Sequence, residues 1–532
     1  MTPGDRAMDA PRLLDDESVR EFVTNGFLRL TPDVPADVHR DIDGLLRFAC
    51  EEETWYGNNI LARVPKMYEV LDCPVVRGAV TSLAGPDYYL HPHRAVHTST
   101  PVAARAAGPL GPAVDAPPMG QGSMAGSGWH QDAQSPLSRA RHHVPRYLIG
   151  FYFPHDTPMA MGPTRVQAGS HLHAHPAEPD GVVFDAVPAG TFFLLHFDMV
   201  HAGFPNTTDR TRYMVKFVFA RTRHPASPSW DNTETAWRRP AGCIPEYDLP
   251  AAWSWLWDWM RGARPAPRPA SGGQVDPGGQ AARLERIYAR AARGEVEALA
   301  DDLSAGARRG RHERKLARDD AGRVLPRDDI RGYPLRWNER AVVMEDAAYG
   351  LAACGRAAMP ALLALVGRED PWLRINAAFA LGEMGPAATD TVPAVAALLD
   401  DPHQQVVRQA LDALGAIGRG LDAVLPAIER LLTAGNPAWR EPQVMRGWVA
   451  EDQVRLNAAF VLLNAVSNPG QTDLAAIERI AAAALGSGNG YVSAVLAETL
   501  VRIGTPTAQA SAIRYLSERR WDETLMGRRK AY

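Results

Sequence analysis

Cysteine is scarce in this sequence, and long apolar runs are missing. The 532 residues include 4 cysteines, which are Cys50, Cys73, Cys243 and Cys354. No CxxC pair occurs among them, so the spacing argues against a disulfide scaffold or a zinc ribbon, and we expect a reducing, cytoplasmic environment. No run of about 18 apolar residues is present, so we expect no membrane-spanning helix. Residues 1–18 are polar and acidic and lack the apolar centre of a signal peptide.

A strong excess of one charge is also absent. Lys and Arg together number 57 and Asp and Glu 61, which gives a formal net charge of −4. A dedicated nucleic-acid-binding protein normally presents a basic face and has a high isoelectric point. We therefore expect no nucleic-acid partner.

Composition changes sharply along the chain and predicts a multidomain protein. Residues 12–225 contain short β-branched and aromatic runs separated by turn residues, and residues 226–262 are rich in tryptophan. Residues 263–281 are rich in Pro and Gly, which is typical of a linker. A charged helical connector is expected at 282–339 and a helical repeat region at 340–520, where Ala and Leu recur at helical period.

The repeat region is recognised by a pattern that recurs three times. The segments DAAYGLAACG, NAAFALGEMG and QALDALGAIG end at Gly355, Gly385 and Gly418, at intervals of 30 and 33 residues. Small residues at helix crossings, inward leucines and a glycine stop are typical of stacked helix pairs. The region resembles HEAT repeats, about five of them, in an all-α solenoid. Such an array more often binds a protein partner or braces a neighbour than catalyses.

The first segment predicts a β-rich domain with flanking helices. In LLDDESVREFVTNGFLRL, Asp15 or Asp16 caps a short helix, Gly26 ends it, and FLRL begins a strand. Later runs such as RYLIGFYFP, GTFFLLHF and TRYMVKFVFA have the composition of strands. A double-stranded β-helix, the jelly-roll or cupin fold, accommodates them, with helices against one sheet.

Three residues of this segment form a candidate metal site. On an extended strand, residues i and i+2 face the same side, so His130 and Asp132 can bind one ion together while Gln131 points elsewhere. His201 follows His130 by 71 residues, at the end of an apolar strand. Two histidines and one carboxylate form the facial triad of non-haem Fe(II) oxygenases, which leaves positions open for oxygen and organic ligands. Arg212, eleven residues after His201, would return beside the metal and can bind a carboxylate through two hydrogen bonds.

These motifs together resemble one enzyme family. NGFLRL after the opening helix, WHQD, GPTRVQAGSH and HAGFPNTTDRTR are similar to the phytanoyl-CoA dioxygenase family of Fe(II)/2-oxoglutarate-dependent oxygenases, over residues 12–222. The resemblance implies that His130, Asp132 and His201 bind Fe(II) and that Arg212 binds the distal carboxylate of 2-oxoglutarate. It also implies that Gln131 touches this cosubstrate. Arg210 is the rival to Arg212, and the interval from His201 that the family shows favours Arg212.

The same resemblance implies a reaction. With O2 and 2-oxoglutarate, the enzyme would hydroxylate a small molecule, such as a secondary-metabolite intermediate or a carrier-bound substrate, and release succinate and CO2. Halogenating relatives lack a carboxylate at the position of Asp132, so hydroxylation is favoured, while desaturation and ring closure stay open. Two other functions also stay open: an interaction scaffold with an inactive oxygenase domain, and a protein hydroxylase that docks its substrate on the repeats.

Further residues have competing interpretations. The loop 101–128 is either a lid or an insertion, and the tryptophans after 250 form either an interface or a substrate-stacking wall. HxHxH is either a second metal site or a solvent-facing turn. The other histidines are candidates for the lining of the barrel, for an anion site or for a pocket wall. The residues concerned are Trp253, Trp255, Trp257, Trp259, His171, His173, His175, His91, His93, His97, His142, His143 and His196.

Overall fold

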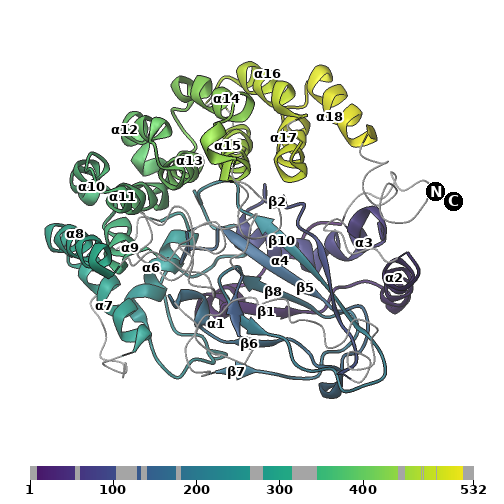
Figure 1. Cartoon of the computed structure of the whole chain (residues 1–532). Helices are drawn as coiled ribbons and strands as arrows, with labels where there is room; N and C mark the ends of the chain where they lie inside the picture. Colours follow the sequence, from purple (N-terminus) through teal and green to yellow (C-terminus); the bar gives the residue numbers. More distant parts are fainter. Residues whose placement is uncertain are drawn as a thin grey trace.

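The structure of the chain is a computed structural model. It describes residues 9–53, 60–102, 129–132, 140–174, 181–263, 279–313, 344–440, 450–468, 470, 472–486 and 488–518. Strands gather in the lower half of the view in Figure 1, and the C-terminal helices form an arc above them. The loop expected to be a lid, apart from its first two residues, and His175 of the HxHxH motif lie outside the described residues.

The first helix forms where its capping residues predict it. α1 (Asp16–Asn25) begins after Asp15, whose side chain accepts a hydrogen bond from a backbone N–H of the first turn. It ends at Gly26, which has φ +80°, and a Cβ there would lie 2.4 Å from Nδ1 of His171. β1 (Phe27–Leu30) follows at once. The predicted helix, glycine stop and strand are confirmed.

Helices next cover one face of the main sheet. α2, the π-helix η1, the 3-10 helix η2, α3 and α4 span Ala36–Arg47, Phe48–Glu52, Ile60–Ala62, Met67–Leu71 and Pro74–Ala84. Pro74 fills the first position of α4, where its missing N–H costs nothing. α4 packs on β5, β8 and β10, and its apolar side chains Val76, Val80 and Leu83 are fully buried.

Two antiparallel sheets make up the β-rich part. β2 to β10 span Tyr89–Leu90, Ala95–Ser99, His130–Gln131, Tyr147–Tyr152, Arg165–Gln167, Val182–Val183, Phe192–His196, Val200–Ala202 and Arg212–Ala220. Short 3-10 helices η3 (Met159–Met161) and η4 (Ser170–Leu172) lie between them. One sheet contains β3-β10-β5-β8, extended by β1 and β2, and the other has the order β4-β9-β6-β7. These two four-strand orders are those of a double-sheet jelly roll.

Alternation along β10 separates the two faces of the main sheet. Tyr213, Val215, Phe217 and Phe219 pack with α1 and α4 in one buried cluster. Met214, Val218 and Ala220 point the other way, into the second cluster. Because side chains alternate along a strand, Arg212 and Lys216 share the face of Met214. Two cationic side chains therefore point to the interior of the jelly roll.

The tryptophan-rich segment forms a helix against α1. α6 spans Pro250–Met260, and Trp253 and Trp257, one helical turn apart, are both fully buried. Arg20 of α1 lies over the Trp257 ring at 4.6 Å. Trp255 instead contacts Tyr288 of the next helix, with ring centroids 5.2 Å apart. The tryptophans therefore pack between elements, as the interface interpretation expects.

Pairs of short helices fill the rest of the described chain. α7 to α18 span Gln280–Ala292, Val296–Glu313, Asp346–Ala353, Met359–Val366, Pro371–Glu383, Val392–Ala397, Gln404–Ile417, Leu425–Thr433, Ala450–Ser467, Leu474–Ala484, Gly490–Ile503 and Pro506–Glu518. The 3-10 helices η5 to η9 between them span Gly355–Ala358, Gly385–Thr391, Leu398–Asp400, Asp422–Val424 and Pro437–Trp439. α7 and α8 pack on α9, so stacking begins before the segment where the sequence repeats.

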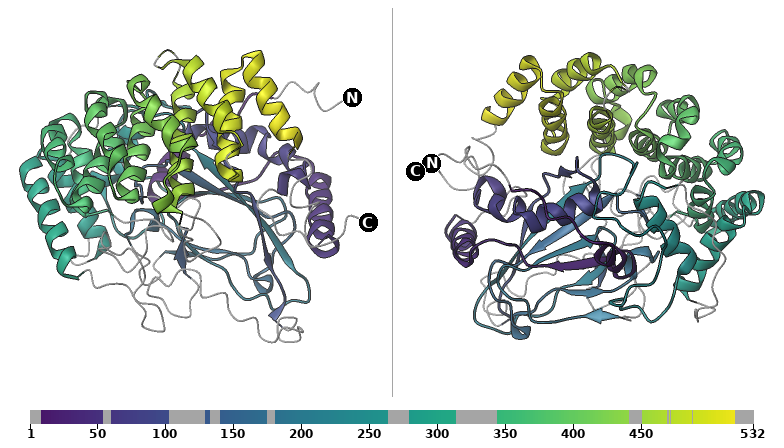
Figure 2. Two further views of the ribbon diagram at one scale, coloured as in Figure 1. Left: turned by 45° about the horizontal axis from the view of Figure 1, so that its top comes forward. Right: turned by 180° about the vertical axis from the view of Figure 1, so that it is seen from behind.

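The predicted helix stops of the repeats are confirmed. Gly355, Gly385 and Gly418 have φ of +60°, +57° and +64°. At the opening of one repeat, the Asp370 side chain accepts a hydrogen bond from the backbone N–H of Trp372. α9, α11, α13, α15 and α17 form an inner row, which faces the β-rich part (Figures 1 and 2).

The inner row and the jelly roll share one hydrophobic core. The largest buried cluster contains Phe151 and Met214 of the sheet together with Phe379 of α11 and Phe460 of α15. His91 stacks on Phe460 with ring planes 3° apart. Burial of apolar surface across this boundary stabilises both parts at once. In the described part of the chain, no helix is both long and apolar enough to cross a membrane.

Candidate metal centre

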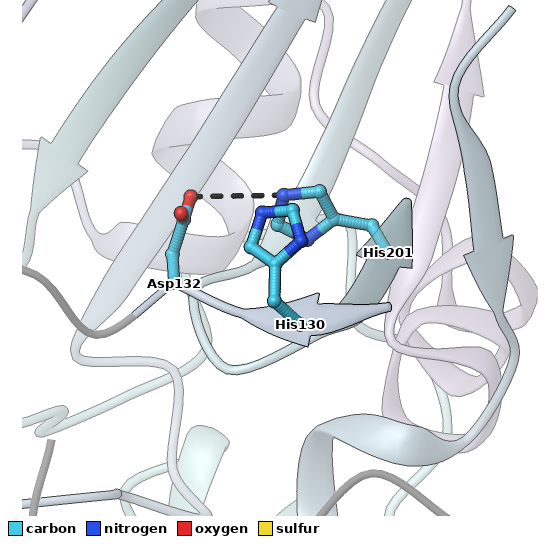
Figure 3. A group of neighbouring side chains, drawn as sticks. All are labelled: His130, Asp132 and His201. Carbon is cyan, nitrogen blue, oxygen red and sulfur yellow. Dashed lines mark ion pairs between the residues drawn. The ribbon is translucent and has the colours of Figure 1, made fainter. Parts of the chain in front are cut away.

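The three predicted ligands come together at the edge where β4 pairs with β9. His130 on β4 is the register partner of His201 on β9, and Asp132 follows His130 by two residues. One ligand atom from each side chain lies within 4.8 Å of the other two. The imidazole centroids are 4.4 Å apart, and Nε2 of His201 is 3.9 Å from the Asp132 carboxylate (Figure 3). The antiparallel register and the two-residue spacing therefore put all three donors on one face.

His201 is held in an orientation that suits a metal ligand. Its Nδ1 lies 3.0 Å from the carbonyl oxygen of Met199, so Nδ1–H donates and Nε2 keeps its lone pair. Burial and the neighbouring His130 lower the pKa of His201 to about 4. Phe151 packs edge-on against the ring, with centroids 5.3 Å apart. The imidazole is thus neutral at pH 7, which is the form that binds a cation.

Lys216 completes the candidate centre and was not predicted from the sequence. Its Nζ donates a hydrogen bond to Oδ2 of Asp132 from β10. Burial would raise the pKa of Asp132, but Lys216 and the two histidines outweigh it and hold the pKa well below its usual range. The strand period offered a signal, because Lys216 is four residues after Arg212 and so shares its face.

Arg212 is buried on the same face of β10. Nη1 donates to the carbonyl oxygen of Gly162 at 2.9 Å and lies 3.4 Å from the Thr164 hydroxyl. Among the described residues no carboxylate pairs with Arg212, and its buried Nε has no hydrogen-bond partner there. Burial lowers the pKa of Arg212 to about 10. A guanidinium without a carboxylate in such surroundings fits an anionic ligand. Arg210 lies in the exposed turn before β10.

Gln131 points away from the three ligands. Its Nε2 donates to the carbonyl oxygens of Asp198 at 2.9 Å and His173 at 3.1 Å. Since neighbouring residues of a strand face opposite sides, this amide does not lie on the face of His130. The structure therefore brings His130, Asp132 and His201 together, and it orients Gln131 toward the turn before β9.

The other histidines occupy several environments. His97 of β3 is a register partner of Met214, and burial and the charge of Lys216 lower its pKa to about 3. His171 packs on His196, with ring centroids 5.2 Å apart. Among the described residues, the triad is the one group of three or more side chains positioned to share a metal ion. His91, His93, His142 and His143 contact the helical array.

Comparisons with known proteins match the two parts of the chain separately. Residues 346–444 match the family model for HEAT repeats. A search of curated proteins finds no match to the chain. Similar solved structures include the non-heme monooxygenase ThoJ in a nickel complex, with 20% identity and a TM-score of 0.28, covering 43% of this chain and 91% of that one.

Two further similar structures contain 2-oxoglutarate. HygX from Streptomyces hygroscopicus, with nickel and 2-oxoglutarate bound, is 13% identical with a TM-score of 0.29, covering 40% of this chain and 88% of that one. EctD from S. alaskensis, with 2-oxoglutarate and 5-hydroxyectoine, is 16% identical with a TM-score of 0.31, covering 45% of this chain and 88% of that one.

Proposed function

We propose that the protein is a non-haem Fe(II)/2-oxoglutarate-dependent dioxygenase that hydroxylates a small molecule. His130, Asp132 and His201 would hold the iron, and Arg212 would bind the distal carboxylate of 2-oxoglutarate. The main support is that three buried or half-buried ligand atoms within 4.8 Å share the jelly-roll interior with a buried guanidinium that no described carboxylate pairs with. Two imidazoles and one carboxylate suit a divalent iron and leave coordination positions open.

Bound iron, with 2-oxoglutarate and O2, supplies an oxidant that can hydroxylate a carbon atom, with release of succinate and CO2. The side chains of this protein have simpler tasks. The Met199 carbonyl fixes the ring of His201, and Lys216 keeps Asp132 ionised before metal arrives. Phe151 packs against the His201 ring, and Phe153 lies beneath the Arg212 guanidinium. Both rings are buried and would help to keep water from the bound groups.

A carboxylate at position 132 supports hydroxylation over halogenation. Asp132 would occupy the coordination position that a halogenating site keeps for a halide. Desaturation and ring closure use the same oxidant, and analysis of the reaction product would distinguish them from hydroxylation. The array supports a small-molecule substrate, because its inner row already contacts the jelly roll through residues such as Phe460 and Tyr349. A protein docked on that row would have to displace these contacts, which favours a small-molecule substrate.

The deciding experiment is an anaerobic titration of the purified full chain with Fe(II) and 2-oxoglutarate. The readout is the weak visible charge-transfer band of the chelate. We expect a band in the wild type, no band in His130→Ala and a weakened band in Arg212→Ala. Arg210→Ala is the matched control, because this arginine is two residues away and exposed, and it should leave the band unchanged.

The opposite outcome is equally clear. If the wild type gives no band while other divalent ions are also refused, the oxygenase proposal is wrong and the scaffold hypothesis replaces it. If the band forms but 2-oxoglutarate is consumed without hydroxylation of any small molecule tested, a protein substrate becomes the alternative.

A further inference from the structure

The segment 140–146 lies between the candidate metal centre and the helical array. It begins eight residues after Asp132, and Arg141, His142 and His143 within it are all buried. His143 stacks on Tyr349 of α9, with ring centroids 4.0 Å apart and planes 13° apart. The Tyr349 hydroxyl donates to the carbonyl oxygen of Arg141 at 2.9 Å. Segment 140–146 therefore lies directly against the inner row of helices.

Two carboxylates of the array hold this segment. Nδ1 of His142 lies 2.9 Å from Glu383 of α11, and Nε2 lies 3.8 Å from Asp412 of α13. Nη1 of Arg146 reaches the same two carboxylates at 3.4 and 3.5 Å. Burial would raise the pKa of Glu383, but His142 and Arg146 outweigh it and lower the pKa. Buried charged groups are stable only while their partners stay in place, because removal of one leaves the charge of the other uncompensated.

The same segment binds the turn that precedes His201. Asp198, in the turn between β8 and β9, accepts a hydrogen bond from Arg141 Nη1 at 3.0 Å and one from the backbone N–H of His142 at 3.3 Å. Asp198 is itself buried, with 4% of its surface exposed. A single buried carboxylate thus ties the turn to two consecutive residues of the segment.

This turn orients both ligand-bearing strands. Gln131, between His130 and Asp132, donates to the carbonyl oxygen of Asp198 at 2.9 Å. The next residue, Met199, accepts the hydrogen bond that fixes His201, at 3.0 Å. The path from Glu383 to His142, Asp198 and the ligands is therefore made of buried polar contacts, each shorter than 3.5 Å.

We propose that Glu383 and Asp412 are positioning residues for the metal centre, and that the helical array serves to hold the turn before β9 and the segment after β4 in the geometry that binds metal. This inference rests on the proposed function. Neither carboxylate belongs to the metal-binding group, and each acts on it through His142 and Arg146. Outer partners that orient metal ligands typically change metal affinity by about 10–100-fold when they are removed.

The test uses the full chain, with Mn(II) binding followed by electron paramagnetic resonance and Co(II) binding followed by its visible absorption. We expect Glu383→Gln and Asp412→Asn to weaken Mn(II) binding by about tenfold and to change the position and intensity of the Co(II) bands. Tyr349→Phe is a milder variant that deletes the hydrogen bond to Arg141. It should change the same spectrum less.

The control is an ion pair of the array that lies outside the path. Glu429 of α14 pairs with Arg479 of α16 at 2.5 Å on the surface, so Glu429→Gln should leave affinity and spectrum unchanged. Unchanged binding and spectrum in Glu383→Gln and Tyr349→Phe would overturn the positioning role while the metal site stands. Failure of the wild type to bind either ion would instead refute the proposed function.

Discussion

Lys216 donates a hydrogen bond to the carboxylate of Asp132, and both side chains are largely buried at the candidate metal centre. The ammonium group of Lys216 is the counter-charge of Asp132, the carboxylate that we expect to bind a metal cation. In the absence of metal this pairing offsets the cost of a buried anion. A divalent ion would take over the same compensation.

Replacement of the ammonium by an apolar side chain tests this exchange. Lys216→Met should lower the free energy of unfolding of the metal-free protein by about 3 kcal/mol, because Asp132 is left buried without its partner. Added metal should then stabilise the variant more than the wild type. Thermal unfolding with and without Mn(II) measures both effects, and Lys66→Met, which removes an exposed pair with Asp41, is the control. Equal metal-induced shifts in variant and wild type would contradict the expectation.

Arg212 should act on the cosubstrate and not on the metal. A lysine keeps the charge but loses the planar pair of donors, so Arg212→Lys should weaken 2-oxoglutarate binding by about 2 kcal/mol, or about thirtyfold. Mn(II) affinity should stay unchanged, because the guanidinium hydrogen-bonds to Gly162 and Thr164 and contacts no metal ligand in the described chain. Titration of the charge-transfer band measures the first quantity, and Arg210→Lys serves as the control. A loss of metal affinity equal to the loss of 2-oxoglutarate affinity would refute this division of roles.

Acidification should weaken the contact between jelly roll and array through His143. Burial lowers its pKa from 6.5 to about 3, so the folded protein keeps the ring neutral while the unfolded chain binds a proton below about pH 6.5. The contribution to stability is therefore lost as pH falls from 6.5 toward 3, by about 1.4 kcal/mol for each pH unit. His143→Phe can still stack on Tyr349 and should lose this part of the pH dependence. The midpoints of urea unfolding at pH 7.5 and 5.5, for the wild type and for His143→Phe, measure this pH dependence. An identical pH dependence in the two proteins would disprove the role of His143.

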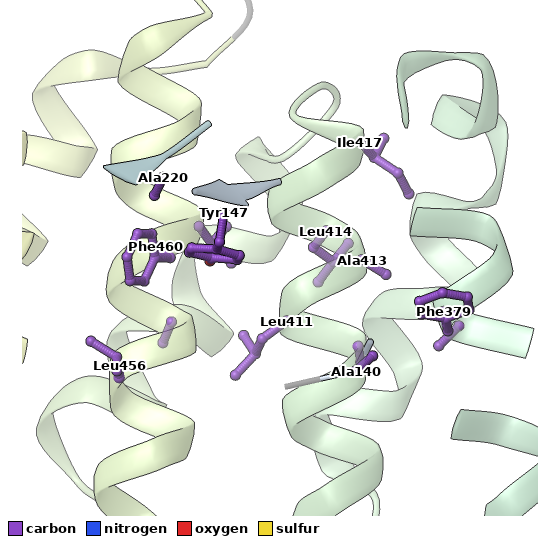
Figure 4. Packing of buried hydrophobic residues seen from close by; sticks show 14 of the residues in the cluster. Ala140, Tyr147, Ala220, Phe379, Leu411, Ala413, Leu414, Ile417, Leu456 and Phe460 are labelled. Atoms are coloured by element: carbon purple, nitrogen blue, oxygen red, sulfur yellow. The ribbon is translucent and has the colours of Figure 1, made fainter. Parts of the chain in front are cut away.

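Phe460 of α15 should couple the stabilities of the two parts. Its ring lies within 6.4 Å, centroid to centroid, of Tyr89, His91 and Tyr147 on the β-rich side. Figure 4 shows Phe460 beside Tyr147. Phe460→Ala should lower the free energy of unfolding by about 3–5 kcal/mol, because it leaves a cavity between α15 and the sheet.

Because the cavity would lie in a shared core, unfolding of the array and of the jelly roll should shift together. Tryptophan fluorescence reports in large part on the region of α6, where six of the 13 tryptophans lie, and far-ultraviolet circular dichroism reports on the helices. Ile513→Ala, on the exposed surface of α18, is the matched control with little expected effect. A shift confined to one of the two signals would show that the parts unfold independently.

Local rules in the sequence were enough for several features. The cap at Asp15, the stop at Gly26 and the glycine stops of the repeats depend on a few neighbouring residues, and the structure confirms them. The ligand pair His130 and Asp132 needed only the two-residue period of a strand. His201 and Arg212 were proposed from their places after an apolar strand and across a hairpin return, and the resemblance then assigned roles to both.

Other features depended on residues far apart in the chain. Lys216 lies against Asp132, 84 residues away in the chain, and Gln131 faces the turn at Asp198, 67 residues away. Both contacts follow from the register and packing of the strands. The sequence pattern of the repeats likewise does not predict which surface their inner row of helices packs against. Contacts such as His142 with Glu383 join positions 241 residues apart. Sequence periodicity determines which face of an element is apolar or polar, whereas the partner of that face is decided only when the chain closes and buries both surfaces together.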